Sequence, residues 1–167
     1  MGVKVRLGRP EDAAGILECL LASVSERVWL DRDESEVGIS NPDVLKERIS
    51  KFKPDKNAYI VATMDSQIIG FILLVRGNLK STKHLADFGM SILPAYREQG
   101  IGTMLVEEAI NWAEHWKVEK LYCCTFHTNQ RAIKLYEKLG FSREGTRVKQ
   151  YKINGEYVDQ LLFGKLL

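Results

Sequence analysis

The sequence has no large excess of charge of either sign and no long hydrophobic run. Lys and Arg number 24 and Asp and Glu 22 among 167 residues, which leaves a formal charge of +2. A protein that binds mainly to a nucleic-acid backbone usually carries a clear basic excess, so nucleic acid is not an expected partner. The longest apolar run, Ile68 to Val75, is far too short to span a bilayer, and the N-terminal residues show no apolar secretion signal. These absences predict a soluble, cytoplasmic protein without a membrane partner.

Cysteine is also scarce, with three residues in the chain. Two of them, Cys123 and Cys124, are adjacent in an apolar run and cannot easily bridge each other. We therefore expect reduced thiols in the core, and for Cys124 a packing role. No metal site is expected.

The stretch YREQGIGTML, Tyr96 to Leu105, matches neither of the two common phosphate-binding motifs. Counting from Gly100, the pattern G-x-G-x-x-G continues at Gly102 but meets Leu105 in place of the third glycine, and no G-K-[ST] triplet follows. What is present is a basic residue, Arg97, and two glycines that open a helix. A helix N-terminus has unpaired N–H groups and a partial positive charge, so the stretch favours an anion site. A strand-to-helix turn that only packs is the alternative for a lone G-x-G.

The chain shows no internal repeat or linker composition, so residues 1–167 are expected to form one domain. Alternating β-branched segments predict strands, and helical spacing with Pro and Asn at the starts predicts helices. The dipeptide Asn154-Gly155 predicts a closing hairpin. The resulting order is β-α-α-β-β-β-α-β-α-β-β, an α/β (α+β) pattern. Strands are expected over residues 3–7, 58–64, 68–75, 85–93, 120–127 and on both sides of 154–155, and helices over residues 10–22, 42–52, 101–116 and 129–139.

Two blocks of sequence resemble one family. PAYREQGIGTML is similar to the acetyl-CoA pyrophosphate loop of the GNAT N-acetyltransferases, R/Q-x-x-G-x-G/A after a strand, with Arg97, Gly100 and Gly102 at its fixed positions. NQRAIKLYEKLGF, residues 129–141, resembles the family's N-x-x-A-x-x-x-Y-x-x-x-G-F segment at every fixed position. The resemblance extends from about Val3 to Leu166. It implies a single GNAT domain: a mixed, mostly antiparallel sheet of about six or seven strands, flanked by about four helices.

The resemblance implies acetyl-CoA as cosubstrate. In the family, the strand over residues 85–93 splays from the strand over residues 120–127, which leaves backbone groups near Ile92 free to hold pantetheine and polarise the thioester carbonyl. Arg97 and the Thr103 hydroxyl would add donors at the edges of the glycine loop. For Asn129 an N-cap role alone is equally compatible with the sequence. The residues expected to bind the cofactor are Ile92, Leu93, Arg97, Gln99, Gly100, Ile101, Gly102, Thr103, Asn129 and Tyr136.

Acetyl transfer to an amine requires a base for the amine and a proton for the departing thiolate. By resemblance Tyr136 protonates the thiolate, and an ordinary half-buried aromatic is the alternative. In the bacterial ribosomal-protein alanine acetyltransferases a glutamate precedes the motif asparagine by five residues, and here that position is Cys124. Asp87, inside an apolar strand, is the better candidate for the base, although a hydrogen-bonded or edge carboxylate would fit equally well. His127 is a second candidate, but a solvated or capping histidine is the more usual reading.

Two features of the sequence indicate the kind of acceptor. The strand around Asp87 and the C-terminal tail resemble the spermidine and ribosomal-protein acetyltransferase branches. Acidic residues between Ser23 and Ser40 would attract a cationic amine, although a solvated, flexible loop is the more usual interpretation of such a run of charges. The predicted function is therefore acetyl transfer to a primary amine, either polyamine-like or a protein N-terminus. The alternative is a catalytically silent acyl-CoA-binding module. GNAT relatives are often dimers, so a homodimer is a further expectation.

Overall fold

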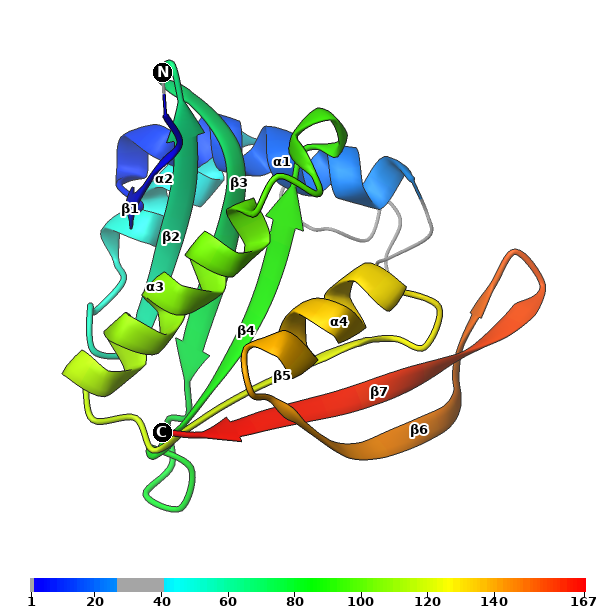
Figure 1. Cartoon of the computed structure of the whole chain (residues 1–167). Helices are drawn as coiled ribbons and strands as arrows, with labels where there is room; N and C mark the ends of the chain where they lie inside the picture. Colours follow the sequence, from blue (N-terminus) through cyan, green and yellow to red (C-terminus); the bar gives the residue numbers. More distant parts are fainter. Residues whose placement is uncertain (1, 27–40) are drawn as a thin grey trace.

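The computed structural model (Figure 1) describes residues 2–26 and 41–167 of the chain. Its helices and strands follow the predicted order. The strands are β1 (Lys4–Leu7), β2 (Asn57–Met64), β3 (Gln67–Arg76), β4 (Leu85–Ile92), β5 (Lys120–Phe126), β6 (Ser142–Ile153) and β7 (Glu156–Leu166). The helices are α1 (Ala13–Ser25), α2 (Pro42–Ser50), α3 (Ile101–His115) and α4 (Gln130–Lys138), with short 3-10 turns η1 (Pro10–Asp12) and η2 (Pro94–Tyr96).

Local chemistry sets several of these boundaries. The Asn41 side chain accepts the N–H of Asp43 at 2.8 Å and so caps α2, while Pro42 occupies its first position. Asn154 and Gly155 both have positive φ, 52° and 87°, as a two-residue type I′ hairpin requires. The helix start at Asn41 and the hairpin at Asn154-Gly155 were therefore predicted from the same local chemistry that forms them.

The seven strands form one sheet in the order β1-β2-β3-β4-β5-β7-β6. Every neighbouring pair is antiparallel except β4 and β5, which pair in parallel over three residues, Leu85 to Asp87 with Lys120 to Tyr122. Beyond Asp87 the two strands separate, and Figure 1 shows β4 and β5 diverging from a common end. The predicted mixed, mostly antiparallel fold is confirmed, and the divergence opens a gap in the middle of the sheet.

Helices cover both faces of the sheet. One buried cluster lies between the sheet and α3 and α4, and includes Ile72, Leu105 and Phe163. The other lies between the sheet and α1 and α2, and includes Ile16 and Leu45. In the described part of the chain no helix is long and apolar enough to cross a membrane.

Two details differ from the sequence prediction. We expected the first helix to end near residue 22, but α1 continues to Ser25, which places Ser23 on a helix with a buried side chain. The helical spacing of the apolar residues Ile101, Met104 and Leu105 predicts that Met104 lies on the core face of α3. Met104 is 36% exposed, and the neighbouring Val106 is buried instead.

Candidate active site

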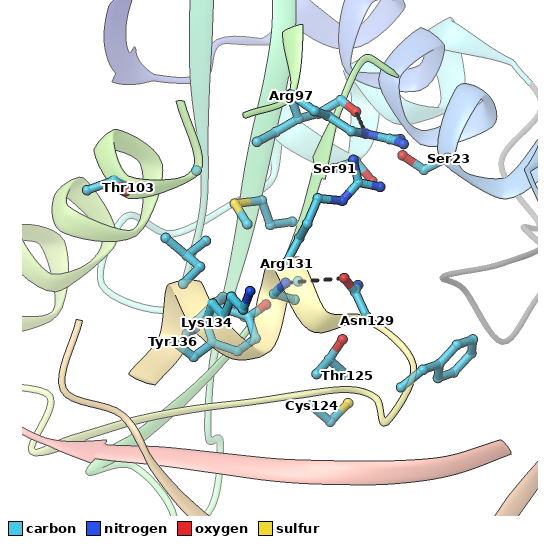
Figure 2. Close-up of a pocket in the computed structure, with 18 of the residues that line it drawn as sticks. Ser23, Ser91, Arg97, Thr103, Cys124, Thr125, Asn129, Arg131, Lys134 and Tyr136 are labelled. Atoms are coloured by element: carbon cyan, nitrogen blue, oxygen red, sulfur yellow. Dashed lines mark hydrogen bonds between the residues drawn. The ribbon is translucent and has the colours of Figure 1, made fainter. Parts of the chain in front are cut away.

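The gap between β4 and β5 forms the floor of a cleft of about 610 Å³. Its size is within the usual range for a small-molecule site. One side is formed by the residues before and at the start of α3 and by α4, and the other by α1, β6 and β7. Figure 2 shows side chains of α1, β4, β5 and α4 converging on it. Of the predicted site residues, those that line the cleft are Asp87, Ile92, Arg97, Gly100, Gly102, Thr103, Asn129 and Tyr136.

The backbone of β4 presents unpaired groups to the cleft. The Leu93 N–H donates to Ile69 O of β3 at 2.9 Å, so this peptide group points away from β5. Because successive peptide groups of a strand point to opposite sides, the N–H groups of Met90 and Ile92 point toward the gap. Two backbone donors therefore face the space where a thioester carbonyl or an amide chain would lie.

The glycine loop leads directly into α3. Gly100 has φ of +81° and a Cβ built there would meet open space, so the left-handed conformation is what calls for glycine. A Cβ at Gly102 would lie 3.0 Å from Leu135 Cδ2, so this glycine lets α3 approach α4 closely. We expected both glycines to make room for a phosphate, but Gly102 serves at least in part to bring the two helices together.

The Arg97 side chain is directed differently from the prediction. Its Nε donates to Ile92 O at 3.0 Å, and its NH1 lies 2.9 and 2.8 Å from the two carboxylate oxygens of Glu26. The guanidinium is thus held at the end of β4 and beside α1, and it does not extend along the glycine loop.

Three other predicted cofactor residues have no side chain in the cleft. Leu93 is buried in the core under α1, and Ile101 is buried in the core under α3. The Gln99 amide donates to Ala95 O at 3.0 Å and so stabilises the turn. A contribution of these three residues to a ligand is therefore limited to their backbone groups.

Helix α4 contributes polar groups from one face. The Asn129 side chain accepts the Ala132 N–H at 3.2 Å and caps the helix, as the alternative reading of this residue stated. Arg131, Lys134 and Lys138 all line the cleft. Their spacing of three and four residues places them along one side of the helix. Sequence reasoning missed this basic row, although the spacing was visible in QRAIKLYEK.

Tyr136 lies at the bottom of the cleft and is 5% exposed. Its ring packs against Phe88 and Phe163, with ring centroids 5.7 and 5.6 Å away. Burial, and then the thiol of Cys123 beside the hydroxyl, raise the pKa of Tyr136 well above its ordinary value. The phenol therefore stays protonated at neutral pH and can act as a proton donor.

Asp87 is on the opposite face of β4 from the aromatic cluster and opens onto the cleft. The Asp87 side chain is exposed to the cleft, whose walls displace much of the water around the carboxylate. This desolvation raises its pKa to about 6, against the opposing hydrogen bond from the Phe88 N–H. Tyr122 is its direct neighbour on β5. Burial and the Asp87 charge raise the pKa of Tyr122 as well.

The side of the cleft formed by α1, β6 and β7 contains a polar wall built on Gln160 of β7, which is 6% exposed. We expect an acceptor amine on this side, which we call the acceptor side. The Gln160 Oε1 accepts from Arg147 at 3.0 Å, and its Nε2 lies 2.9 Å from Tyr151 Oη and 3.0 Å from Cys124 Sγ. The prediction of a buried Cys124 is wrong, because this thiol is exposed and lines the cleft. On β5 its neighbour Cys123 takes the core-facing position.

A bulge in β6 makes this wall possible. Arg147 pairs with Gln160 and Tyr151 with Val158, so between these pairs three residues of β6, 148–150, lie beside one residue of β7, Asp159. Lys149 within the bulge has φ of +51°, and its N–H donates to the Asp159 carboxylate at 2.7 Å. Because of the bulge, Arg147 and Tyr151 lie opposite positions of β7 that are only two residues apart. Both side chains therefore reach the side-chain amide of Gln160.

His127, the second candidate base, does not line the cleft. Its Nδ1 accepts the Asp159 backbone N–H at 3.0 Å, and the His127 backbone N–H donates to Asp159 O at 3.0 Å. The ring therefore supports the start of the bulge, which fits the capping reading. The acidic residues 31, 33, 34 and 36 of the predicted lid lie outside the described residues. Glu26, the one that is described, is paired with Arg97.

Comparison with known proteins agrees with the fold and with the glycine loop before α3. The family model described as the acetyltransferase (GNAT) family matches residues 23–141. The chain belongs to the GNAT family. The predicted resemblance is therefore confirmed.

Individual GNAT proteins similar to this chain differ in the acceptors that their names state. The L-amino acid N-acetyltransferase AaaT of Escherichia coli is 34% identical over 101 residues, 60% of this chain and 62% of its own length. The spermidine N(1)-acetyltransferase of Vibrio cholerae is 28% identical over 120 residues, 70% of this chain and 68% of its own length. Among the curated relatives similar to this chain, the match spans from 52% to 70% of the relative's own length.

A solved structure has the same fold as the described part of this chain. The protein yncA of Salmonella typhimurium, solved with its cofactor acetyl-CoA, has a TM-score of 0.90 and 15% identity, and the match covers all of this chain and 95% of that protein.

The cleft of this GNAT chain has the features that acetyl-CoA requires. The glycine loop gives an anion a route to the first N–H groups of α3, without a side chain at Gly100 in the way. The basic row on α4 lies beside it and adds positive charge for further phosphates. The N–H groups of Met90 and Ile92 match the amide-rich pantetheine arm and the thioester carbonyl. The residues present therefore fit the cofactor.

Proposed function

We propose that the protein transfers an acetyl group from acetyl-CoA to a primary amine. The observation that carries the proposal is the position of two titratable groups at the strand gap, Tyr136 on one face of the sheet and Asp87 on the other. A module that only binds CoA needs the loop and the basic row, but it does not need a protonated phenol and a carboxylate at the point where the strands part.

In this proposal Asp87 is the base that accepts a proton from the amine. A lysine-like amine with a pKa of about 10.4 is almost fully protonated at neutral pH, so that freeing it costs roughly 4.6 kcal/mol. With a pKa of about 6, Asp87 is mostly ionised at neutral pH and is able to attract the ammonium group and to accept its proton. Of the described lining residues on the acceptor side, Asp87 is the one that carries a carboxylate.

The backbone of β4 and Tyr136 act on the acetyl thioester. Acetyl-CoA supplies an activated acetyl group as its thioester. In this proposal the N–H groups of Met90 and Ile92 donate to the carbonyl oxygen as negative charge develops on it. The Tyr136 hydroxyl, which its raised pKa keeps protonated, donates a proton or a strong hydrogen bond to the departing sulfur.

Two relatives guide the choice of acceptors for a test, because one is named for L-amino acids and the other for spermidine. The experiment is thiol release from acetyl-CoA with L-amino acids, spermidine, aminoglycosides and N-terminal peptides as acceptors. CoA binding is measured alongside by calorimetry. We expect acceptor-dependent thiol release with one class of amine and none with its N-acetylated form. Tight CoA binding with no thiol release above hydrolysis for any amine would contradict the proposal and favour the CoA-binding module.

A further inference from the structure

Arg97 makes three described contacts, and none leads toward the helix N-terminus. Two join its NH1 to the Glu26 carboxylate, and one joins its Nε to Ile92 O. Glu26 follows the last residue of α1 and is 71 residues away in sequence. The side chains of Arg97 and Glu26 are 16% and 28% exposed. The pair thus ties the first residue of the glycine loop to two elements, α1 and β4.

This geometry competes with phosphate binding. To reach a pyrophosphate, Arg97 would have to leave both carboxylate oxygens and the Ile92 carbonyl. That movement would leave a partly buried carboxylate and a carbonyl at the strand end without a donor, which is costly in free energy. The phosphate also has other donors, since the N–H groups of α3 and the basic row on α4 line the same cleft.

The contact with Ile92 gives the pair a catalytic consequence. The Ile92 peptide N–H faces the gap and is placed to donate to the acetyl carbonyl. Its carbonyl is held by Arg97, and Arg97 is held by Glu26. On α1, three residues before Glu26, the buried Ser23 lines the acceptor side of the cleft. The pair therefore fixes the strand end and the loop relative to the helix that lines the acceptor side.

We propose that Glu26 and Arg97 act together as positioning residues that hold the glycine loop against the end of β4, and that Arg97 is not a ligand of the pyrophosphate. This inference rests on the proposed function, because it takes CoA as the ligand of the loop. It assigns a role to Glu26 that the loop motif alone does not contain.

The test is a double-mutant cycle with Glu26→Gln, Arg97→Gln and both together. The CoA dissociation constant is measured by calorimetry without an acceptor. We expect each single variant to weaken CoA binding by about 10-fold, a typical coupling for residues of one hydrogen-bond network. We expect the double variant to be no weaker than either single variant, because the second substitution removes a partner that is already lost.

Arg97→Lys separates charge from geometry. It keeps the positive charge but cannot make the same contacts with Glu26 and Ile92 at once. We expect it to bind CoA as weakly as Arg97→Gln does. Glu144→Gln is the matched control, since it breaks another ion pair, Lys120 to Glu144, outside the cleft, and should leave CoA binding unchanged.

Several results would overturn the inference. If Arg97 is a phosphate ligand, Glu26→Gln frees it and leaves CoA binding unchanged or tighter, while Arg97→Gln weakens it. Additive losses of CoA affinity in the double variant would also contradict the proposed role of the pair, and so would wild-type CoA binding by Arg97→Lys. A wild type that binds CoA without acetylating any amine would count against the proposed function alone, because the cycle is measured without turnover. A wild type that does not bind CoA would overturn both.

Discussion

Tyr136 and Asp87 are brought close to one cleft but experience opposite surroundings. Tyr136 is enclosed by Phe88 and Phe163, so its proton is held tightly, and Asp87 opens onto the cleft and is mostly ionised at neutral pH. Two titratable groups whose environments keep one protonated and the other ionised are what proton donation and proton acceptance in one reaction need. The residue-scale predictions test each group separately.

Tyr136→Phe should lower kcat by about 10-fold to 10⁴-fold, the usual range for loss of a general acid. The CoA dissociation constant should stay close to that of the wild type, because phenylalanine fills the same space among the aromatic rings. Steady-state kinetics and calorimetry measure the two quantities. Unchanged turnover would remove the Tyr136 hydroxyl from the mechanism.

The pH dependence of the reaction should report Asp87. Its pKa is raised to about 6, so kcat/KM should rise with pH through this value as the carboxylate ionises and becomes able to accept a proton. Asp87→Asn should be slow and should lack this rise. The measurement is kcat/KM between about pH 5 and pH 8 with one amine acceptor. A variant that keeps the same rise would assign it to another group.

Asp87 should also affect stability, in the direction that its raised pKa sets. The native state holds the proton more tightly than the unfolded chain, so ionisation of Asp87 disfavours folding, and this penalty disappears as the pH falls from above 6 toward 4. Asp87→Asn should therefore raise the urea midpoint at about pH 7.5 more than at about pH 4. An equal gain at both pH values would show that charge is not the cause.

At the scale of single elements, the start of α3 depends on a left-handed residue. Gly100→Ala should lower the free energy of unfolding by roughly 1 kcal/mol, since an L-residue is strained at φ of +81°. It should also weaken CoA binding through the shifted loop. Gly145→Ala is the control, because a Cβ there makes an ordinary contact at 3.8 Å and φ is not positive. Equal losses in both variants, measured by urea unfolding, would contradict the explanation.

The basic row on α4 gives a second prediction for an element. Lys134→Gln should weaken CoA binding and make it less sensitive to salt, because one positive charge beside the phosphates is lost. Lys46→Gln, on the exposed side of α2, should change neither quantity. Calorimetry at two salt concentrations measures both. An identical effect of the two substitutions would indicate only a change in overall charge.

The elements themselves could largely be predicted from the sequence, whereas the contacts between distant residues could not. The Asn caps, the glycine start of α3 and the final hairpin are local features whose chemistry is complete within a few residues. The Glu26 to Arg97 pair joins residues 71 apart, and the wall around Gln160 depends on a bulge in β6 that no local signal marked. The exposure of Cys124 was missed because only one of two adjacent cysteines in a strand can face the core, and the packing of the whole sheet decides which one.

At the scale of the whole molecule, the sheet consists of two parts that pair in parallel over three residues. β1 to β4 form one part, and β5 to β7 form the other. The two proposed contact regions for CoA, the loop before α3 and the row on α4, follow strands on opposite sides of the divergence. A ligand that occupies the cleft therefore contacts both parts at once and should stabilise the native state as a whole.

CoA at about 100 times its dissociation constant should contribute about 2.7 kcal/mol to stability. For a domain of this size, such a gain corresponds to a rise in Tm of roughly 5 to 10 °C. The thermal melt of the wild type with CoA measures it, with 3′-phosphoadenosine 5′-diphosphate as the control, because this molecule has the 3′-phosphate and both 5′-phosphates of CoA but not the arm that enters the gap. When the control and CoA are each present at the same multiple of their own dissociation constants, equal Tm shifts are expected from mass action alone.

The informative comparison is at equal concentration, where CoA should give the larger Tm shift. Equal shifts there would show that the gap between β4 and β5 contributes nothing to binding.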